Sequence, residues 1–171
     1  KRNDCRIRQV RLVPEHPQPL PESIEAIAQA DLILLGPGSL YTSIIPNFLV
    51  DGIAEAVAAS PACKVLVMNI MTQEGETEGY TGADHVRALL RHGGPNIIDV
   101  CVANSTPVPE DVSDAYRVED AEQLVLCREE IEAMGIQVRC HPLLAMGQRA
   151  RHDSAALATV LMDVLRNYAV G

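Results

Sequence analysis

Short runs of apolar residues recur along the chain, and each is bounded by glycine, proline or polar residues. Runs of this length, rich in Val, Ile and Leu, are typical of strands that are buried on both faces of a parallel sheet. The pattern predicts core strands at 31–35, 64–68 and 97–103. Further strands are predicted at 5–13, 122–126 and 136–140.

Helices are predicted between these strands, with limits set by proline, glycine and capping residues. Pro21 begins a helix to Ala30, and Pro46 suits the first turn of a helix that runs to about Ser60. The alternation predicts one α/β domain over 1–171: a doubly wound, mostly parallel Rossmann-like sheet with helices on both faces. The remaining helices are expected at 83–94, 128–135 and 153–168.

Composition narrows the classes of function. The 171 residues are 47% hydrophobic, which is enough to bury a core, and no apolar run is long enough for a membrane span or a signal peptide. We therefore expect a cytoplasmic protein with no membrane insertion. Fourteen basic and 23 acidic residues give a net charge of -9, and aromatic residues are only 3%. Both features argue against a nucleic-acid partner.

The five cysteines form no C-x-x-C pair, so neither a disulfide framework nor a metal site is predicted. Cys63 and Cys101 lie in apolar runs and are interpreted as small core residues. A basic cluster near the start of the chain is expected to be a solvated edge strand. It comprises Lys1, Arg2, Arg6, Arg8 and Arg11.

Polar residues follow three of the predicted strands at the point where each strand ends. Gly36 to Ser39 follows the first core strand, Asn69 follows the second, and Asn104 follows the third. The carboxyl ends of parallel strands share one rim of the sheet, and open α/β folds bind ligands at that rim. We therefore expect these residues to lie together and to contact a ligand.

The first strand end carries an excess of small polar residues. Gly36 and Gly38 allow close approach to the backbone, and hydroxyls follow at Ser39, Thr42 and Ser43. Together with the start of the next helix, these groups predict a phosphate site, although the P-loop pattern is absent. The alternative is an ordinary strand-to-helix turn.

Two other segments hold candidate ligand residues. The long polar loop after the second core strand contributes Asn69, Thr72 and Gln73. Its glutamates suit a divalent cation or sugar hydroxyls, and the alternative is a solvated loop. Near the C-terminus, Arg151 precedes the expected helix cap Asp153 and offers a planar fork to a phosphate or carboxylate. A plain surface arginine is the alternative there.

Four stretches resemble the gluconeogenesis factor family of YvcK-like proteins, which are related to the CofD phospholactate transferases. They read "ADLILLGPGSLYTSIIPNFLV", "NIMTQEGETEGYTGADHV", "NIIDVCVANS" and "RHD". The resemblance runs from about Arg6 to the C-terminus. The family's N-terminal segment, with its own glycine-rich nucleotide loop, has no counterpart here, so the chain is expected to be the second half of a longer protein.

The resemblance implies a regulator that binds UDP-N-acetylglucosamine and acts on carbon metabolism, cell-envelope precursor synthesis and cell shape. It implies ligand contacts for Tyr116, in "AYRVEDAEQL", and for Arg151. It also implies no dedicated cofactor, a protein partner in envelope precursor synthesis and a homo-oligomer. The second hypothesis is a CofD-like phospholactyl or nucleotide transferase that needs Mg²⁺. The third is a fragment that serves only as an interaction domain.

Overall fold

A computed structural model describes residues 7–145 and 147–168, and its four strands form one parallel sheet in the order β1-β2-β3-β4. In the register, Leu34 pairs with Val65, Val65 with Val100, and Val100 with Gln137. The predicted parallel α/β architecture is confirmed. The strands are β1 (Leu32–Leu35), β2 (Cys63–Val67), β3 (Val100–Asn104) and β4 (Gln137–His141).

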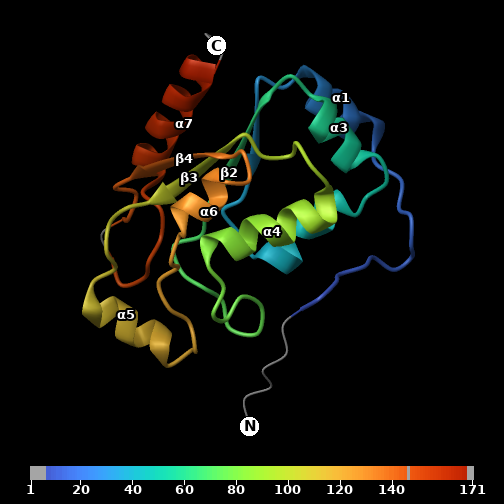
Figure 1. Cartoon of the computed structure of the whole chain (residues 1–171). Helices are drawn as coiled ribbons and strands as arrows, with labels where there is room; N and C mark the ends of the chain where they lie inside the picture. The colour runs from blue at the N-terminus through green and yellow to red at the C-terminus, as the bar shows by residue number, and fades with distance from the viewer. Residues whose placement is uncertain (1–6, 146, 169–171) are drawn as a thin grey trace.

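Helices cover both faces of the sheet, as expected. In Figure 1, α4 and α6 lie on one side of the strands, and α7 (red, upper left) lies on the other. The helical elements are α1 (Pro21–Gln29), the π-helix η1 (Leu40–Ile44), α2 (Ile45–Phe48), α3 (Ile53–Ala59), α4 (Gly82–Gly93), α5 (Glu110–Arg117), α6 (Arg128–Glu132) and α7 (Ser154–Tyr168).

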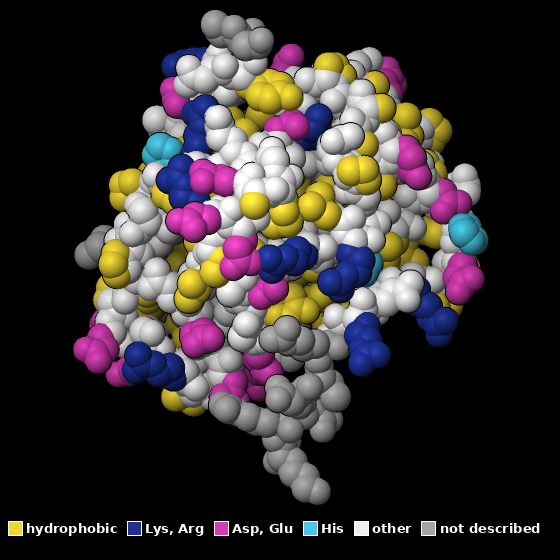
Figure 2. All heavy atoms as spheres, viewed as in Figure 1, with side chains coloured by type: hydrophobic (Ala, Val, Ile, Leu, Met, Phe, Trp, Pro, Cys, Tyr) yellow, Lys and Arg dark blue, Asp and Glu magenta, His cyan; other side chains and the backbone are white. Residues whose placement is uncertain are grey.

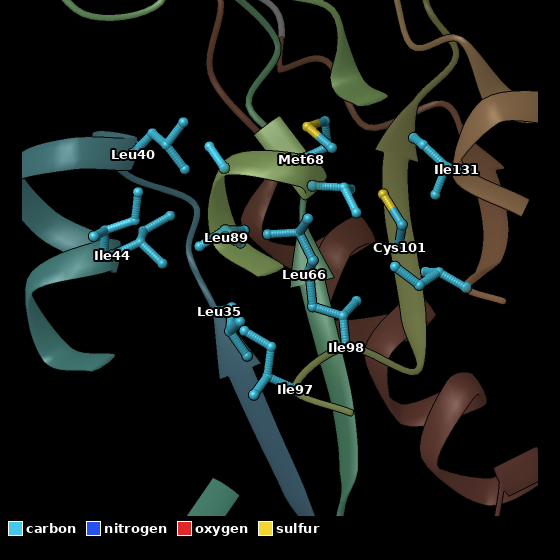
Figure 3. Close-up of a cluster of buried hydrophobic side chains, with 14 of the residues drawn as sticks. Leu35, Leu40, Ile44, Leu66, Met68, Leu89, Ile97, Ile98, Cys101 and Ile131 are labelled. Carbon is cyan, nitrogen blue, oxygen red and sulfur yellow. The ribbon is translucent and has the colours of Figure 1, made fainter. Parts of the chain in front are cut away.

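Alternate strand residues point to two separate cores. Leu66 and Cys101 face the larger core, where they meet helix residues such as Leu89 of α4 (Figure 3). Their neighbours Val65 and Val102 face the smaller core, which α7 covers. This two-sided burial explains why the strand sequences are apolar throughout instead of alternating. The cysteines at 63 and 101 are fully buried, as predicted, and burial raises the pKa of the Cys101 thiol to about 12.

The strands run in sequential order, so the three crossovers advance in one direction across the sheet. Right-handed crossovers that advance in one direction place their helices on one face. That leaves the opposite face to α7, the segment that follows β4. Open α/β folds often bind ligands where the strand order reverses. The described strands show no such reversal, so strand order does not locate a ligand site on the rim.

The helix predicted from Pro46 to about Ser60 is broken in the structure. Pro46 does lie in the first turn of α2, but α2 ends at Phe48. The chain then turns through Gly52, whose φ of +78° belongs to the left-handed region that favours glycine. The backbone N–H of Asp51 donates to the Pro17 carbonyl instead of continuing the helix.

The strand predictions at 5–13 and 122–126 are wrong over the described residues. From residue 7 to 13 the chain is irregular, because side chains satisfy its backbone: Tyr41 donates to the Ile7 carbonyl and Val10 N–H donates to His92. Segment 122–126 makes only an isolated antiparallel bridge, Met71 to Gln123. Arg8 and Arg11 are exposed as expected, whereas Lys1, Arg2 and Arg6 lie outside the described residues.

No single helix in the described ranges is long and apolar enough to cross a membrane; one sharply bent pair, Leu40–Phe48 with Ile53–Ala59, meets the length and composition test. Acidic and basic side chains are interspersed over the face shown in Figure 2. Several of the arginines are paired with carboxylates. The pairs include Arg87 with Glu130, Arg117 with Asp114 and Arg128 with Glu132.

Candidate functional site

A cleft of about 610 Å³ opens where β1 and β2 end, beside the first turns of α7. Four of the residues proposed from sequence meet in it: Gly38, Asn69, Tyr116 and Arg151. The other seven proposed residues do not line it. The full lining is Pro37, Gly38, Asn69, Ile70, Met71, Tyr116, Ala150, Arg151, His152, Ser154, Leu157, Ala158 and Leu161.

The cleft has an apolar floor and a polar rim. Ile70 and Met71 follow β2, and Leu161 comes from α7; all three are at least nine-tenths buried. Polar groups at the rim come from separate elements, with Tyr116 on α5 and Arg151 just before α7. A cleft of this kind suits a ligand that has a ring or other apolar part and a polar or charged part.

The two glycines of the β1 loop differ in what they require. Gly36 has a φ of +80°, and a Cβ there would lie 3.1 Å from Ile44 Cδ1 and 3.2 Å from the Val67 carbonyl oxygen. Both the conformation and the space therefore demand glycine. A Cβ on Gly38 would meet only Ser43, at an ordinary 3.5 Å. Gly38 is the one of the two that lines the cleft.

Asn69 holds the loop through its side-chain amide. Its Nδ2 donates to the Gly38 carbonyl oxygen at 2.8 Å, and the Gly38 N–H donates to Asn69 Oδ1 at 3.2 Å. The amide thus pairs with both the N–H and the carbonyl group of one residue. Asn69 also lines the cleft, so it joins the loop to the cleft wall.

The hydroxyls predicted to bind phosphate face a carboxylate instead. Ser39 Oγ lies 2.6 and 2.8 Å from the two carboxylate oxygens of Glu76 and donates to that group. Thr42 contacts Ser39 Oγ through its own hydroxyl and N–H, and the Tyr41 N–H reaches Glu76 at 3.4 Å. The side chain of Ser43 is exposed. A carboxylate at these donors opposes a phosphate in the same place.

The remaining proposed residues tie loops together. Thr72 is buried and exchanges hydrogen bonds with the backbone of Glu122. Asn104 Oδ1 accepts from the Leu143 N–H at 3.0 Å, and its amide also bonds the backbone of Thr106. The side chain of Gln73 is exposed. Within the described ranges, no group of three His, Cys, Asp or Glu side chains could hold a metal ion.

Arg151 lies at the N-terminal end of the longest helix. The predicted cap is confirmed, because Asp153 Oδ1 accepts from the N–H groups of Ala155 and Ala156 at 2.9 Å each. The exposed Arg151 side chain has no carboxylate partner among the residues described, unlike Arg128. An unpaired guanidinium beside the positive end of a helix favours an anion there.

Tyr116 reaches the cleft from a helix that the sequence pattern did not predict. Helix α5 lies between two stretches rich in proline and acidic residues, and Val112 is its only buried residue. Gln123 fixes the stretch before α5, because its Oε1 accepts from the Val108 N–H at 2.9 Å. The stretch after α5 is held by the Ala121 N–H, which donates to the Tyr116 carbonyl.

Sequence reasoning missed two polar residues of the cleft wall, His152 and Ser154, and the whole apolar floor. Burial lowers the pKa of His152, and its Nε2 has no hydrogen-bond partner within the described residues. The imidazole is therefore neutral near pH 7 and does not act as an anion-binding cation. Its place in "RHD" was the only available signal. Nothing in the sequence distinguishes the floor residues Ile70 and Leu161 from other core residues.

The chain is similar in sequence to proteins of a known family. The gluconeogenesis factor of Bacillus subtilis (strain 168) is 46% identical over 162 residues, which cover 94% of this chain and 51% of that protein. The corresponding protein of Halalkalibacterium halodurans is 38% identical over 159 residues, 92% of this chain and 49% of its own length. The chain thus spans about half the length of these curated relatives.

The fold and the sequence profile agree with these relatives. A crystal structure of a UPF0052 family protein from Bacillus halodurans matches with a TM-score of 0.89 and 38% identity, over 92% of this chain and 51% of that one. The profile of the family described as 2-phospho-L-lactate transferase CofD matches residues 1–144. The match covers most of the chain, and the chain therefore belongs to the CofD family.

Proposed function

We propose that the cleft binds a nucleotide sugar, UDP-N-acetylglucosamine, and that binding regulates carbon metabolism and cell-envelope precursor synthesis, and through them cell shape. The observation that carries the proposal is the unpaired Arg151 at the mouth of a cleft that Tyr116 and Gly38 also line. A diphosphate would lie at Arg151, beside the N-terminus of α7. The relatives named gluconeogenesis factor support the link to carbon metabolism.

The size and lining of the cleft support a ligand of this class. Its volume of about 610 Å³ is within the range of small-molecule sites. The apolar floor, with Ile70 and Leu161, would cover a ring face or the methyl group of an N-acetyl group. Tyr116 would offer a hydrogen bond to a hydroxyl or amide group of the ligand.

The side chains of the cleft favour binding over catalysis. Its described lining holds no Asp, Glu, Lys or Cys, and the one imidazole, His152, is half-buried and neutral. The wall does hold the hydroxyl of Ser154, but His152 Nε2 has no hydrogen-bond partner within the described residues, so no nucleophile is paired with a base there. A regulatory ligand needs neither.

A CofD-like transfer of a phospholactyl group is the second candidate, because the transferase profile covers residues 1–144. Since the chain spans about half of its relatives' length, groups from elsewhere in such a protein would have to supply the Mg²⁺ ligands in that case. The two functions differ in one measurable respect. A transferase consumes its nucleotide donor, whereas a regulator releases UDP-N-acetylglucosamine unchanged.

The test is calorimetric titration of UDP-N-acetylglucosamine into the intact protein and into Arg151→Ala. Loss of paired, charge-assisted hydrogen bonds should cost about 1.5 to 3 kcal/mol, roughly a tenfold to hundredfold loss of affinity. Arg151→Lys should recover only part, because an ammonium group lacks the planar fork. Arg166→Ala, an exposed arginine near the other end of α7, is the matched control and should bind normally.

Equal affinity of Arg151→Ala and the parent at matched salt would show that Arg151 is an ordinary surface residue. Consumption of a nucleotide donor with Mg²⁺ present, followed by chromatography, would favour the transferase instead. Failure of the intact protein to bind any nucleotide would leave the interaction domain as the remaining hypothesis.

A further inference from the structure

The loop between β1 and η1 is held by the connection that follows β2. Asn69, the first polar residue of that connection, donates to the Gly38 carbonyl oxygen at 2.8 Å and accepts from the Gly38 N–H at 3.2 Å. Further along the same connection, Glu76 binds Ser39 Oγ and the Tyr41 N–H. Two adjacent strand ends are thereby joined by side-chain contacts above the sheet.

These contacts leave few backbone donors free in the glycine loop. The Gly38 N–H is bonded to Asn69, and the Tyr41 N–H to Glu76. The N–H groups of Thr42, Ser43 and Ile44 all bond to Ser39. An open cradle of amides for a phosphate is therefore not formed in this part of the described chain. The loop contributes the shape of one wall, at Pro37 and Gly38.

We propose that Asn69 is a positioning residue for the cleft: it fixes the Gly38 peptide, and through it the wall that the ligand contacts. This inference rests on the proposed function for its binding consequences. A Cβ added at Gly38 would make only an ordinary contact with Ser43, so the space beside this residue is open. The two hydrogen bonds to Asn69 are side-chain contacts that hold the backbone of Gly38 there.

Helix α2 offers a comparable amide side chain away from the cleft. Asn47 Nδ2 donates to the carbonyl oxygens of Ser43 at 2.7 Å and Ile44 at 3.3 Å. Asn47 is exposed and does not line the cleft. Asn47→Ala therefore removes two side-chain to backbone hydrogen bonds from the same loop and helix start, and it serves as the matched control for Asn69→Ala.

The first measurement needs no ligand. Amide hydrogen exchange of the intact protein should show the Gly38 N–H exchanging about tenfold faster or more in Asn69→Ala, because its acceptor is gone. Protection in the β2 and β3 strands should remain at the level of the parent. Asn47→Ala should leave the Gly38 amide unchanged. Unchanged exchange at Gly38 in Asn69→Ala would overturn the positioning role.

The second measurement compares UMP, UDP and UDP-N-acetylglucosamine by calorimetry. A misplaced wall should weaken all three by a similar factor, about threefold to tenfold, in Asn69→Ala and not in Asn47→Ala. A loss confined to the sugar-bearing ligand would instead show that Asn69 contacts the sugar directly, and would overturn the proposal. If the parent binds none of the three, the proposed function fails, while the exchange result at Gly38 still decides the role of Asn69.

Discussion

At the scale of single residues, the two glycines of the β1 loop serve different purposes although they lie two positions apart. Gly36 is required by its backbone, with a φ of +80° and the Val67 carbonyl oxygen 3.2 Å from any added Cβ. Gly38 is free of that constraint and faces the cleft. Stability and binding should therefore respond separately to substitutions at these two positions.

We predict that Gly36→Ala lowers the free energy of unfolding by about 1 to 3 kcal/mol, because alanine must adopt a strained backbone. Gly38→Ala should change it by less than about 0.5 kcal/mol. Chemical denaturation of both variants measures the difference. Equal destabilisation would mean that the loop adopts another backbone path in solution. A bulkier change, Gly38→Val, should still weaken UDP-N-acetylglucosamine binding if the ligand contacts this wall.

At the scale of elements, helix α4 contains a buried histidine whose charge state affects stability. His85 is 3% exposed. Its Nδ1–H donates a hydrogen bond to the Thr81 carbonyl oxygen at 2.9 Å, and its Nε2 has no partner among the described residues. Burial lowers the pKa of His85, although the Thr81 bond acts in the opposite direction. The start of α4 is otherwise secured by a capping box between Thr81 and Asp84.

Stability should consequently fall in acid. The unfolded chain takes up a proton at His85 near the ordinary pKa of about 6.5, whereas the folded chain takes it up only at lower pH. The free energy of unfolding should therefore decrease as pH falls below about 6.5, and level off below the lowered pKa. Denaturation of the parent and His85→Gln between pH 7.5 and 5 tests this, with a shallower pH slope expected for the variant.

His141→Gln is the control for that slope, because His141 lies at the end of β4 and is not fully buried. An unchanged slope in His85→Gln, or the same flattening in His141→Gln, would assign the acid sensitivity to other groups. His152 is the next group to examine, since burial lowers its pKa in the same direction.

Helix α5 shows where local patterns carried too little information. With one buried residue, Val112, it has almost no apolar stripe, and proline and acidic residues surround it. The core strands were predictable because each is an apolar run buried on both faces, and α4 was predictable from its amphipathic spacing and terminal glycines. The polar residues at the strand ends were predictable because they directly follow those apolar runs. Their hydrogen-bond partners were not, because a contact such as Ser39 with Glu76 joins residues that are far apart in the sequence.

At the scale of the whole molecule, strand β1 forms one edge of the sheet, pairing only with β2 among the described strands. Leu34 is 47% exposed on this edge. Unpaired backbone groups beside an exposed leucine promote association.

We predict that a protein made of residues 1–171 alone associates as its concentration rises, and that Leu34→Lys weakens association by about tenfold without unfolding it. Sedimentation velocity over a range of concentrations measures both; a parent that stays a monodisperse monomer throughout would contradict the prediction.

The position of the cleft has a consequence for how the molecule opens. Gly38 and Leu157 line the same cleft, although three of the four described strands are formed by the chain between them. A molecule in the cleft would therefore contact both the early and the late parts of the sequence and hold them together. Its binding free energy would be lost whenever α7 detaches, so occupancy would oppose partial opening at that helix as well as complete unfolding. Protease sensitivity of the segment around Arg151 would then report the concentration of the ligand.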